Sequence, residues 1–381
     1  MKILLLGAGM MGRAIAYDLA RTPDVRQVVV ADKESSKVKS LMDWVGSGKL
    51  KADRVDVRKS SEVIPLMKGC RVAISAVPYF FNFGLARAAV DAGVSFCDLG
   101  GSLETVLREL ELSQEAKQKG ITIIPDCGFN PGIGNILAAL GAKKLDEVEE
   151  IHIRDGGIPL EPKPPLGYTI LFSPYGLIKE YTEKSVNIRN GELVELEPMT
   201  ELEEVEFPPP FGTLEGFLYH GGTSTLPHTF MGKVKELEAK CLRYPGHCEK
   251  IRVLNELGLT SKEPVLIEGK EVKPRDLLGE VLLKNLGREE PDASLMRVTF
   301  KGKQGGIDKE LTLLLIDYYD YDNQITSMMR TTGFSISIIA QMLARGEISV
   351  KGAFPPELSV PPERFLEELD KRGISISESS R

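Results

Sequence analysis

The sequence of 381 residues is poor in the side chains that build metal centres and disulfide frameworks. It contains four histidines and five cysteines, with no C-x-x-C pair and no H-x-x-x-H spacing. An odd number of cysteines in a long chain, without these spacings, predicts neither a zinc site nor a set of disulfides. We therefore expect no metal and a reducing, cytoplasmic location.

Long apolar runs and an excess of basic residues are also missing. No stretch approaches the ~20 apolar residues that cross a bilayer, and 48 Lys and Arg stand against 55 Asp and Glu, a net charge of -7. These absences argue against a membrane or nucleic-acid partner. With 42% hydrophobic residues the chain is instead long enough for two globular domains, with a small molecule as the expected partner.

A glycine-rich turn follows the first apolar run. Residues 2–6 predict a buried strand, Gly7-Ala8-Gly9-Met10-Met11-Gly12 follows, a helical pattern comes next, and a second apolar strand ends at Asp32. In this arrangement the glycines permit a tight turn, phosphate approach and close helix packing, while the acid binds a ribose and repels a 2′-phosphate. The glycines alone would fit a turn in any α/β protein. The complete pattern predicts a dinucleotide site that prefers NAD, although Lys33 next to Asp32 tempers that preference.

Three later strands are predicted over residues 72–77, 95–99 and 121–125, separated by helical stretches. The carboxyl ends of parallel strands meet at one crevice of a doubly wound sheet. We therefore expect their end loops to complete the cofactor site. The predicted cofactor-binding residues are Gly7, Gly9, Met10, Met11, Gly12, Asp32, Ala76, Val77, Pro78 and Gly100.

Several motifs, taken in order, resemble the saccharopine dehydrogenase/reductase superfamily, and most closely its L-lysine 6-dehydrogenase branch. They are Ser75–Tyr79, Asp126–Gly132, Ser173-Pro174 with Glu180-Tyr181, Leu242–His247 and Thr331-Thr332-Gly333. The resemblance implies an α/β fold: a Rossmann-type doubly wound parallel sheet built from both chain ends, with an inserted α+β substrate and dimerisation domain. We assign residues 1–133 and 325–381 to the first domain and 134–324 to the second, in a homodimer or higher homo-oligomer.

The middle of the chain independently supports an inserted domain of another type. Met296, Val298 and Phe300 alternate with polar residues, which predicts a half-exposed antiparallel strand. A Gly305-Gly306 turn then leads to a second strand over residues 309–317. This pattern differs from the strand and helix alternation of the first third.

Five residues are candidates for the chemistry: Asp126, Cys127, Asn130, Arg243 and His247. Asp126 either orients a substrate ammonium or caps a helix, and Cys127 either polarises the substrate or packs. Asn130 departs from both branches, in which the resemblance implies alanine or aspartate. Arg243 is the candidate clamp for a carboxylate, with a structural salt bridge as the alternative, and His247 either carries a proton or is a structural histidine.

The resemblance implies NAD-dependent oxidation of L-lysine at its ε-carbon, which gives 2-aminoadipate 6-semialdehyde, its cyclic piperideine-6-carboxylate, ammonia and NADH. Hydride can leave only from the neutral amine, and neutralising an amine of pKa about 10.4 at pH 7 costs roughly 4.6 kcal/mol. We therefore expect the rate to rise with pH. The alternatives are a saccharopine-type oxidoreductase, a non-catalytic NAD-sensing module and, less favoured, a methyltransferase with a similar glycine loop.

Overall fold

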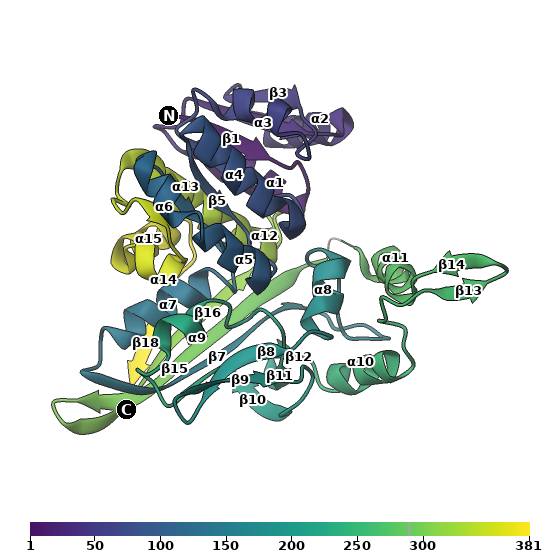
Figure 1. Ribbon diagram of the computed structural model, residues 1–381. Coiled ribbons are helices and arrows are strands. Elements are labelled where there is room, and N and C mark those ends of the chain that lie inside the picture. Colours follow the sequence, from purple (N-terminus) through teal and green to yellow (C-terminus); the bar gives the residue numbers. More distant parts are fainter. Residues whose placement is uncertain (289) are drawn as a thin grey trace. The chain divides into compact units, whose positions relative to one another are not determined.

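A computed structural model describes residues 1–288 and 290–381, and the chain divides into two compact units. Unit 1 contains Met1–Leu140 and Met329–Ile374, and unit 2 contains Gly141–Met328 and Ser375–Arg381. Figure 1 shows the elements of both units. Each unit has its own β-sheet and is described separately below.

Unit 1 contains a seven-stranded parallel sheet in the order β17-β6-β5-β4-β1-β2-β3. The order of the first six strands reverses between β1 and β4, as in doubly wound nucleotide-binding sheets. This confirms the Rossmann-type sheet predicted from the sequence. The strands are β1 (Lys2–Leu6), β2 (Gln27–Asp32), β3 (Leu50–Arg54), β4 (Val72–Ser75), β5 (Ser95–Asp98), β6 (Thr122–Ile124) and β17 (Gly352–Ala353).

Helices connect the strands of unit 1 and flank its sheet (Figure 1). The central strand β1 is apolar from Ile3 to Leu6 and fully buried there, as expected for a strand covered on both faces. The helices in the first part of the chain are α1 (Met10–Arg21), α2 (Ser35–Val45), α3 (Ser60–Met67), η1 (Tyr79–Phe81), α4 (Asn82–Ala92), α5 (Leu103–Leu110), α6 (Ser113–Gln118) and α7 (Ile133–Ala142).

The C-terminal part of the chain returns to complete unit 1. A β-carbon on Gly333 would lie 2.6 Å from Cβ of Ala14, so glycine lets the returning segment pack directly on α1. Residues Ser335 to Ala344 of α13 are all buried, which makes this helix part of the core. The returning helices are α12 (Ser327–Met329), the π-helix η2 (Arg330–Phe334), α13 (Ser335–Arg345), α14 (Pro356–Ser359) and α15 (Pro362–Asp370).

Unit 2 is built on a nine-stranded sheet. Its main path is β10-β11-β12-β7-β15-β16-β18, with β8 pairing with β12 and β9; β12 and β7 are parallel and the other pairs are antiparallel. The predicted alternation over residues 296–301 is confirmed, since Met296, Val298 and Phe300 of β15 are buried and Arg297, Thr299 and Lys301 between and after them are not. The strands are β7 (Glu147–Pro159), β8 (Ser185–Arg189), β9 (Glu192–Leu196), β10 (Glu203–Phe207), β11 (Gly212–Leu218), β12 (Glu236–Arg243), β15 (Asp292–Gln304), β16 (Ile307–Tyr318) and β18 (Ile376–Ser380).

A helical subregion of unit 2 carries a separate hairpin. It contains α8 (Pro174–Glu180), α10 (His247–Glu256), α11 (Pro274–Leu286) and the two-stranded sheet of β13 (Val265–Ile267) and β14 (Lys270–Val272), while α9 (Leu226–Phe230) precedes β12. Within the described parts of the chain, no helix is long and apolar enough to cross a membrane.

The end of the chain lies in a different unit from the one expected. Residues 325–381 were assigned to the nucleotide-binding domain, but β18 pairs antiparallel with β16 from Leu311↔Ser380 to Leu315↔Ile376, so the last seven residues belong to unit 2. The edge of β16 offers unpaired backbone N–H and C=O groups to which β18 hydrogen-bonds. This pairing depends on a strand more than 50 residues away in the chain, so the local sequence does not reveal it. The unit boundaries fall after Leu140 and Met328 instead of after residues 133 and 324.

Candidate functional site

The glycine turn after β1 has the geometry that a bound pyrophosphate requires. Gly7 has φ +104°, and a β-carbon on Gly12 would lie 2.2 Å from the Gly7 carbonyl oxygen. A β-carbon on Gly9 would meet no atom within 4 Å, so space remains open at the N-terminus of α1. The first turn of α1 contains no acidic residue, and Met10 and Met11 there are half-buried. A helix terminus with free amides and no opposing charge suits an anion.

Asp32 is held beside this turn by two backbone amides. Its Oδ2 accepts a hydrogen bond from Ala8 N and its Oδ1 one from Glu34 N, both at 2.9 Å. The carboxylate at the end of β2 is therefore fixed against the glycine turn. The residues present fit a dinucleotide, with the glycine turn for the phosphates and Asp32 for a ribose.

The loop after β4 adjoins the glycine turn, and the loop after β5 adjoins Asp126. A β-carbon on Gly7 would be 2.7 Å from Ala76 O and 3.1 Å from Val77 Cγ1, so the turn after β1 directly adjoins the segment that leads to Pro78. After β5, Gly100 has φ +67°, and a β-carbon there would be 1.8 Å from Asp126 Oδ1. The structure thus brings Gly100 and Asp126 together, although they come from different strands.

Asp126 begins a compact loop after β6. It has φ +59° and is 1% exposed. The Gly128 and Gly132 backbones approach so closely that a β-carbon on Gly132 would be 2.1 Å from Gly128 O, and half-buried Asn130 lies between them. The tight loop fixes the direction of the Asp126 carboxyl at the edge of the sheet.

Cys127 has the environment of a packing residue. It is fully buried, its thiol donates to the Ile124 carbonyl over 3.2 Å, and burial raises the pKa of the thiol well above its usual value. The sulfur therefore stays protonated near neutral pH. This environment supports the packing alternative for Cys127.

Two buried carboxyl groups near Asp126 were not among the sequence candidates. Asp98 ends β5 and accepts hydrogen bonds from Gly100 N at 2.7 Å and Asn82 Nδ2 at 2.9 Å. Glu109 on α5 is fully buried, and burial together with the charges of Asp98 and Asp126 raises its pKa well above the usual value. Burial raises the pKa of Asp98 as well. The sequence signal for the burial of Glu109 is its spacing: it follows the apolar Val106 by three residues, which places both side chains on the same face of α5.

In unit 2, Arg243 and His247 meet in a cluster of buried polar side chains. We call Tyr168, Glu180, Tyr181, Arg243 and His247 the arginine–tyrosine cluster; they come from the ends of β12 and α8, the start of α10 and a loop. Arg243 is 2% exposed, donates from Nε to the Tyr181 hydroxyl at 2.9 Å and lies 4.6 Å from the Tyr168 ring centroid. A β-carbon on Gly156 would lie 3.1 Å from Arg243 Nη1, so glycine leaves room for the guanidinium.

His247, the histidine of this cluster, is 1% exposed. Its Nδ1 lies 3.1 Å from the Leu166 carbonyl and its Nε2 3.1 Å from the Tyr181 hydroxyl. Since a carbonyl can only accept, Nδ1 carries the proton, and the Tyr181 hydroxyl donates to Nε2 while accepting from Arg243. Burial, with Arg243 nearby, lowers the pKa of His247 to about 3, so the imidazole is neutral. These contacts support its structural role.

Glu180 is the carboxyl group nearest to Arg243 in the cluster. Its Oε2 lies 3.8 Å from Arg243 Nη2, and burial raises its pKa to about 8 against the opposing effect of the guanidinium. Nη1 of Arg243 already donates to the Leu242 carbonyl at 2.8 Å. The cluster therefore combines a fixed cation with a carboxyl group, and once Glu180 has lost its proton the two charges complement an amino-acid zwitterion.

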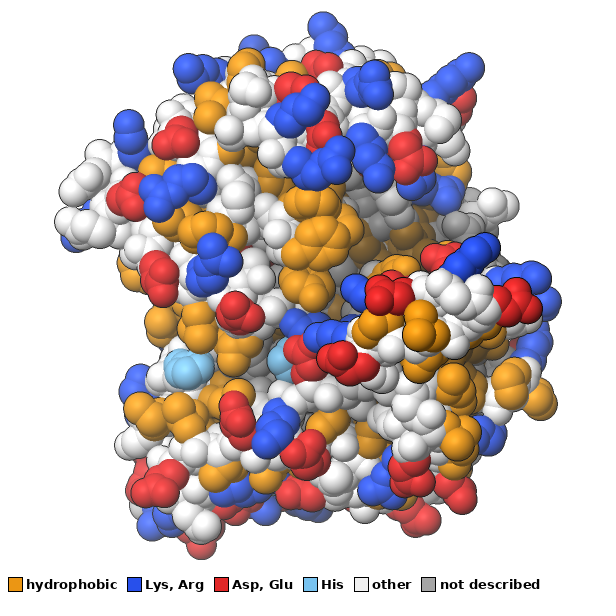
Figure 2. All heavy atoms as spheres, turned by 45° about the vertical axis from the view of Figure 1, so that its right-hand side comes forward, with side chains coloured by type: hydrophobic (Ala, Val, Ile, Leu, Met, Phe, Trp, Pro, Cys, Tyr) orange, Lys and Arg blue, Asp and Glu red, His pale blue; other side chains and the backbone are white. Residues whose placement is uncertain are grey.

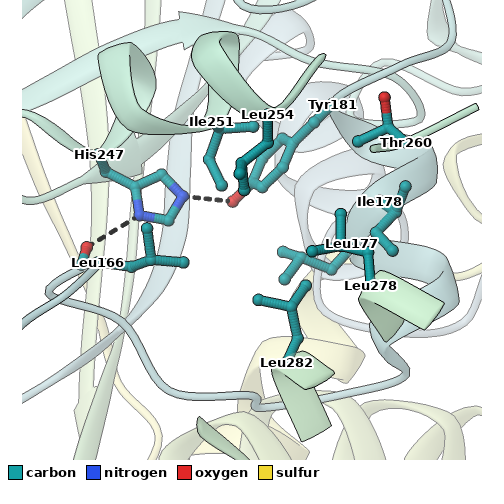
Figure 3. Close-up of a pocket in the computed structure, with 10 residues that line it drawn as sticks. All are labelled: Leu166, Leu177, Ile178, Tyr181, His247, Ile251, Leu254, Thr260, Leu278 and Leu282. Carbon is teal, nitrogen blue, oxygen red and sulfur yellow. Dashed lines mark hydrogen bonds between the residues drawn. The ribbon is translucent and has the colours of Figure 1, made fainter. Parts of the chain in front are cut away.

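An apolar cavity lies behind the cluster (Figure 3). In the close-up, His247, Ile251, Leu254 and Tyr181 lie along one side of it, and Leu177, Ile178, Leu278 and Leu282 lie opposite. It has room for about one water molecule, which is too small for a substrate. The cavity is lined by Leu166, Leu177, Ile178, Tyr181, His247, Ile251, Leu254, Thr260, Leu278 and Leu282. Its apolar wall accounts for the low polarity around His247.

Charged surface groups do not form a field of one sign on the face shown in Figure 2, where Lys and Arg alternate with Asp and Glu. Within residues 1–288 and 290–381, no group of three His, Cys, Asp or Glu side chains is arranged to hold a metal ion.

Comparison with known families gives two adjacent matches that span most of the chain. Residues 3–124 match the saccharopine dehydrogenase NADP binding domain, and residues 128–374 match the saccharopine dehydrogenase C-terminal domain. The first match covers the glycine turn and the strands β1 to β6 of unit 1. It identifies an NAD(P)-binding domain without distinguishing NAD from NADP.

Curated relatives of nearly equal length are about one quarter identical. The carboxyaminopropylagmatine dehydrogenase of Synechocystis is 23% identical, with 98% of this chain and 96% of the relative covered. The carboxynorspermidine synthase of Vibrio cholerae is 24% identical with the same coverage. A solved structure of apo saccharopine dehydrogenase (L-Glu forming) from Saccharomyces cerevisiae superimposes with a TM-score of 0.81 over 100% of this chain and 99% of that one at 20% identity, which shows the shared fold.

Proposed function

The chain belongs to the saccharopine dehydrogenase family of NAD(P)-binding oxidoreductases, and we propose that it transfers hydride between a nicotinamide cofactor and a carbon bonded to nitrogen in an amino-acid substrate. The observation that carries this proposal within unit 2 is the buried Arg243, fixed by Tyr181 with Glu180 beside it. A buried guanidinium next to a carboxyl group complements the two charges of an amino acid. The glycine turn of unit 1 supports the binding of the nicotinamide cofactor that the reaction needs.

For the substrate itself we propose L-lysine, oxidised at its ε-carbon. The products would be 2-aminoadipate 6-semialdehyde, which cyclises to piperideine-6-carboxylate, together with ammonia and the reduced cofactor. Arg243 would bind the α-carboxylate and Glu180 the α-ammonium. This specific assignment rests on the sequence motifs of the lysine branch and on the charges of the cluster.

For the cofactor we propose NAD. When bound, it accepts a hydride from the substrate carbon. The glycine turn would hold its phosphates, and Asp32, fixed by Ala8 N and Glu34 N, would bind the adenosine ribose and repel a 2′-phosphate. Ala76, Val77, Pro78 and Gly100 would border the remainder of the molecule.

The protein must also bind an amine that has lost its proton. Asp126 is the candidate that orients this nitrogen, because it directly follows the C-terminal end of β6 in the parallel sheet. Cys127 and His247 are less suited to move the proton, since one is a buried thiol and the other a neutral imidazole with both nitrogens engaged. With no strong base assigned, we expect kcat/KM to rise with pH as more of the amine is neutral.

The second candidate function is oxidation of a secondary amine of the saccharopine type. The names of the relatives favour it, since they include a saccharopine dehydrogenase and a carboxynorspermidine synthase. Such a substrate carries additional charged groups and would need further side chains to bind them. Half-buried Asn130, which departs from both branches, is the first position to test for that role.

The deciding experiment measures reduction of NAD and of NADP by the purified protein with L-lysine and with saccharopine, in parallel with release of ammonia. We expect lysine-dependent formation of NADH and ammonia in equal amounts. Turnover of saccharopine without lysine would select the second candidate. Tight NAD binding without turnover on a panel of amines would favour a sensing role.

A further inference from the structure

A chain of buried polar groups connects the ends of three neighbouring strands in unit 1. Ser75, the last residue of β4, donates from its hydroxyl to Asn82 Oδ1 at 2.8 Å, and Asn82 Nδ2 donates to Asp98 Oδ1 at 2.9 Å. Asp98 is the last residue of β5, and its backbone oxygen accepts a hydrogen bond of 2.8 Å from Cys127 N in the loop after β6. These four residues are buried, so Asp98 connects strand ends that border the proposed cofactor and substrate sites.

Asp98 also fixes the backbone of the turn that follows it. Its Oδ1 accepts a second hydrogen bond, of 2.7 Å, from Gly100 N. Because a β-carbon on Gly100 would lie 1.8 Å from Asp126 Oδ1, the backbone of this turn directly contacts the Asp126 side chain. A displacement of the Asp98 carboxyl would therefore move the surface against which Asp126 packs.

Glu109 on α5 adds a third carboxyl group to this region. Its side chain is fully buried, and within the described parts of the chain no N–H or O–H group donates a hydrogen bond to either of its oxygens. Its carboxyl lies within hydrogen-bonding reach of the Asp98 carboxyl, and the charges that act most strongly on it belong to Asp98 and Asp126. Two carboxyl groups can form a hydrogen bond only when one of them is protonated.

The hydrogen bonds of the two partners indicate which carboxyl keeps this proton. Asp98 has two N–H donors, from Asn82 and Gly100, which stabilise its ionised form. Glu109 has no such donor, and burial together with the neighbouring acids raises its pKa well above the usual value. A protonated Glu109 satisfies both groups by donating its O–H to Asp98, whereas an ionised Glu109 would repel the Asp98 carboxylate.

We propose that Glu109 is a positioning residue for hydride transfer: it keeps its proton, donates a hydrogen bond to Asp98 and thereby holds the Gly100 turn and the loop that begins at Asp126. Its effect on the substrate passes through these loops, because its own side chain is buried. This inference rests on the proposed function, in which Asp126 orients the substrate nitrogen. The competing role is packing alone, which an apolar residue of similar size would serve equally well.

Two substitutions of similar size separate the two roles. Glu109→Gln keeps an N–H donor for Asp98, whereas Glu109→Leu keeps the volume and removes the donor. Glu104→Gln is the control, because Glu104 is exposed on the same helix. The full chains are compared by steady-state kinetics with L-lysine and with saccharopine, by calorimetric titration with NAD and by hydrogen exchange of the peptides that contain Gly100 and Cys127. Circular dichroism and thermal unfolding verify the fold.

We expect Glu109→Leu to lower kcat at least about tenfold, because a displaced group slows the chemical step, while KM and the dissociation constant of NAD change less than about threefold. Exchange at the two peptides should be faster in this variant. Glu109→Gln should restore kcat to within about twofold of the Glu104→Gln control and should exchange as slowly as the control. Equal kcat and equal exchange in Glu109→Leu and Glu109→Gln would overturn the proposal.

An infrared measurement tests the proton itself and needs neither turnover nor the leucine variant. At about pH 8 the difference spectrum between the unmodified protein and Glu109→Gln should contain the C=O band of a protonated carboxyl, and the corresponding difference for Glu104→Gln should lack it. Absence of this band would overturn the proposal. If the unmodified protein oxidises no amine, the proposed function fails, whereas the exchange and infrared measurements still decide whether Glu109 holds these loops through its proton.

Discussion

The glycine turn of unit 1 and the arginine–tyrosine cluster of unit 2 are built in opposite ways. The turn consists of backbone within a few consecutive residues, and its requirements appear directly as glycines: Gly12 is needed because its β-carbon would lie 2.2 Å from Gly7 O. The cluster consists of side chains from separate elements, held by Arg243, Tyr181 and His247 through hydrogen bonds of 2.9 and 3.1 Å.

This difference has an energetic consequence. A backbone site tolerates changes of side chain but no added atom at the contact, whereas a buried polar cluster depends on every partner, since removal of one leaves the others unsatisfied. The buried pair of Asp98 and Glu109 shows that unit 1 also contains a region of the second kind, directly behind Gly100.

The largest effect is expected when the cluster loses its cation. Arg243→Ala leaves Tyr181 and Glu180 without their buried partner and should lower the free energy of unfolding by about 3–5 kcal/mol. In the proposed enzyme it should also raise the KM for lysine while the affinity for NAD, measured by calorimetry, stays unchanged. Arg58→Ala is the control, because Arg58 forms an exposed ion pair with Asp56, and its removal should change the stability little. Equal losses in the two variants would show that the cluster does not depend on Arg243.

The next largest effect is a gain in stability, and it is expected when buried Glu109 of unit 1 is replaced by glutamine. The folded-state pKa of Glu109 is raised, so the folded protein binds a proton that the unfolded chain releases above about pH 4.3, and stability falls as the pH rises from there towards the folded pKa. Glu109→Gln needs no proton and should be more stable than the parent by about 3 kcal/mol at pH 7, with little difference near pH 4.

Urea unfolding between pH 4 and pH 8 measures this difference. Glu104→Gln is the control on the same helix, since Glu104 is exposed and its substitution should leave the pH dependence unchanged. A stability gain in Glu109→Gln that does not vary with pH would contradict proton uptake by Glu109.

A smaller effect should follow from adding one methyl group to the turn. Gly12→Ala forces a β-carbon against the Gly7 carbonyl and should destabilise the protein by about 1–3 kcal/mol, as overpacking usually does, and weaken NAD binding. Gly84→Ala on α4 is the matched control, because a β-carbon there meets no atom within 4 Å and should add about 0.5–1 kcal/mol of stability. Similar unfolding curves for the two variants would show that the turn can relax.

The smallest effect is expected at the end of β2. Asp32→Asn keeps an acceptor oxygen for Ala8 N but removes the negative charge, so the ratio of the dissociation constants for NADP and NAD should fall about tenfold, or about 1.4 kcal/mol. Asp53→Asn on the neighbouring strand β3, where the side chain is exposed, should leave the ratio unchanged. Calorimetric titration with both cofactors tests this, and an unaltered ratio in Asp32→Asn would exclude the carboxylate as the discriminating group.

The sheet of unit 1 could be predicted because short stretches of sequence determine its strands and turns. The apolar runs that end at Leu6 and Asp32, the three glycines between them and the loops after later strands each have a spacing set by one strand or one turn. The alternation from Met296 to Phe300 was equally readable, since a strand with one buried face repeats every two residues. The family resemblance added that both chain ends build this sheet, which the packing of Gly333 on Ala14 illustrates.

The sequence by itself therefore determined the doubly wound sheet, the glycine turn and the acid beside it, since these depend on backbone conformation and local periodicity. Only the tertiary structure decided that β18 joins unit 2, that Glu109 is buried behind Gly100 and that His247 is neutral between Leu166 and Tyr181. Each of these depends on partners far away in the chain, and burial sets the protonation of a side chain according to those partners. The residues next to each of these positions in the chain therefore do not predict its burial, its pairing or its protonation.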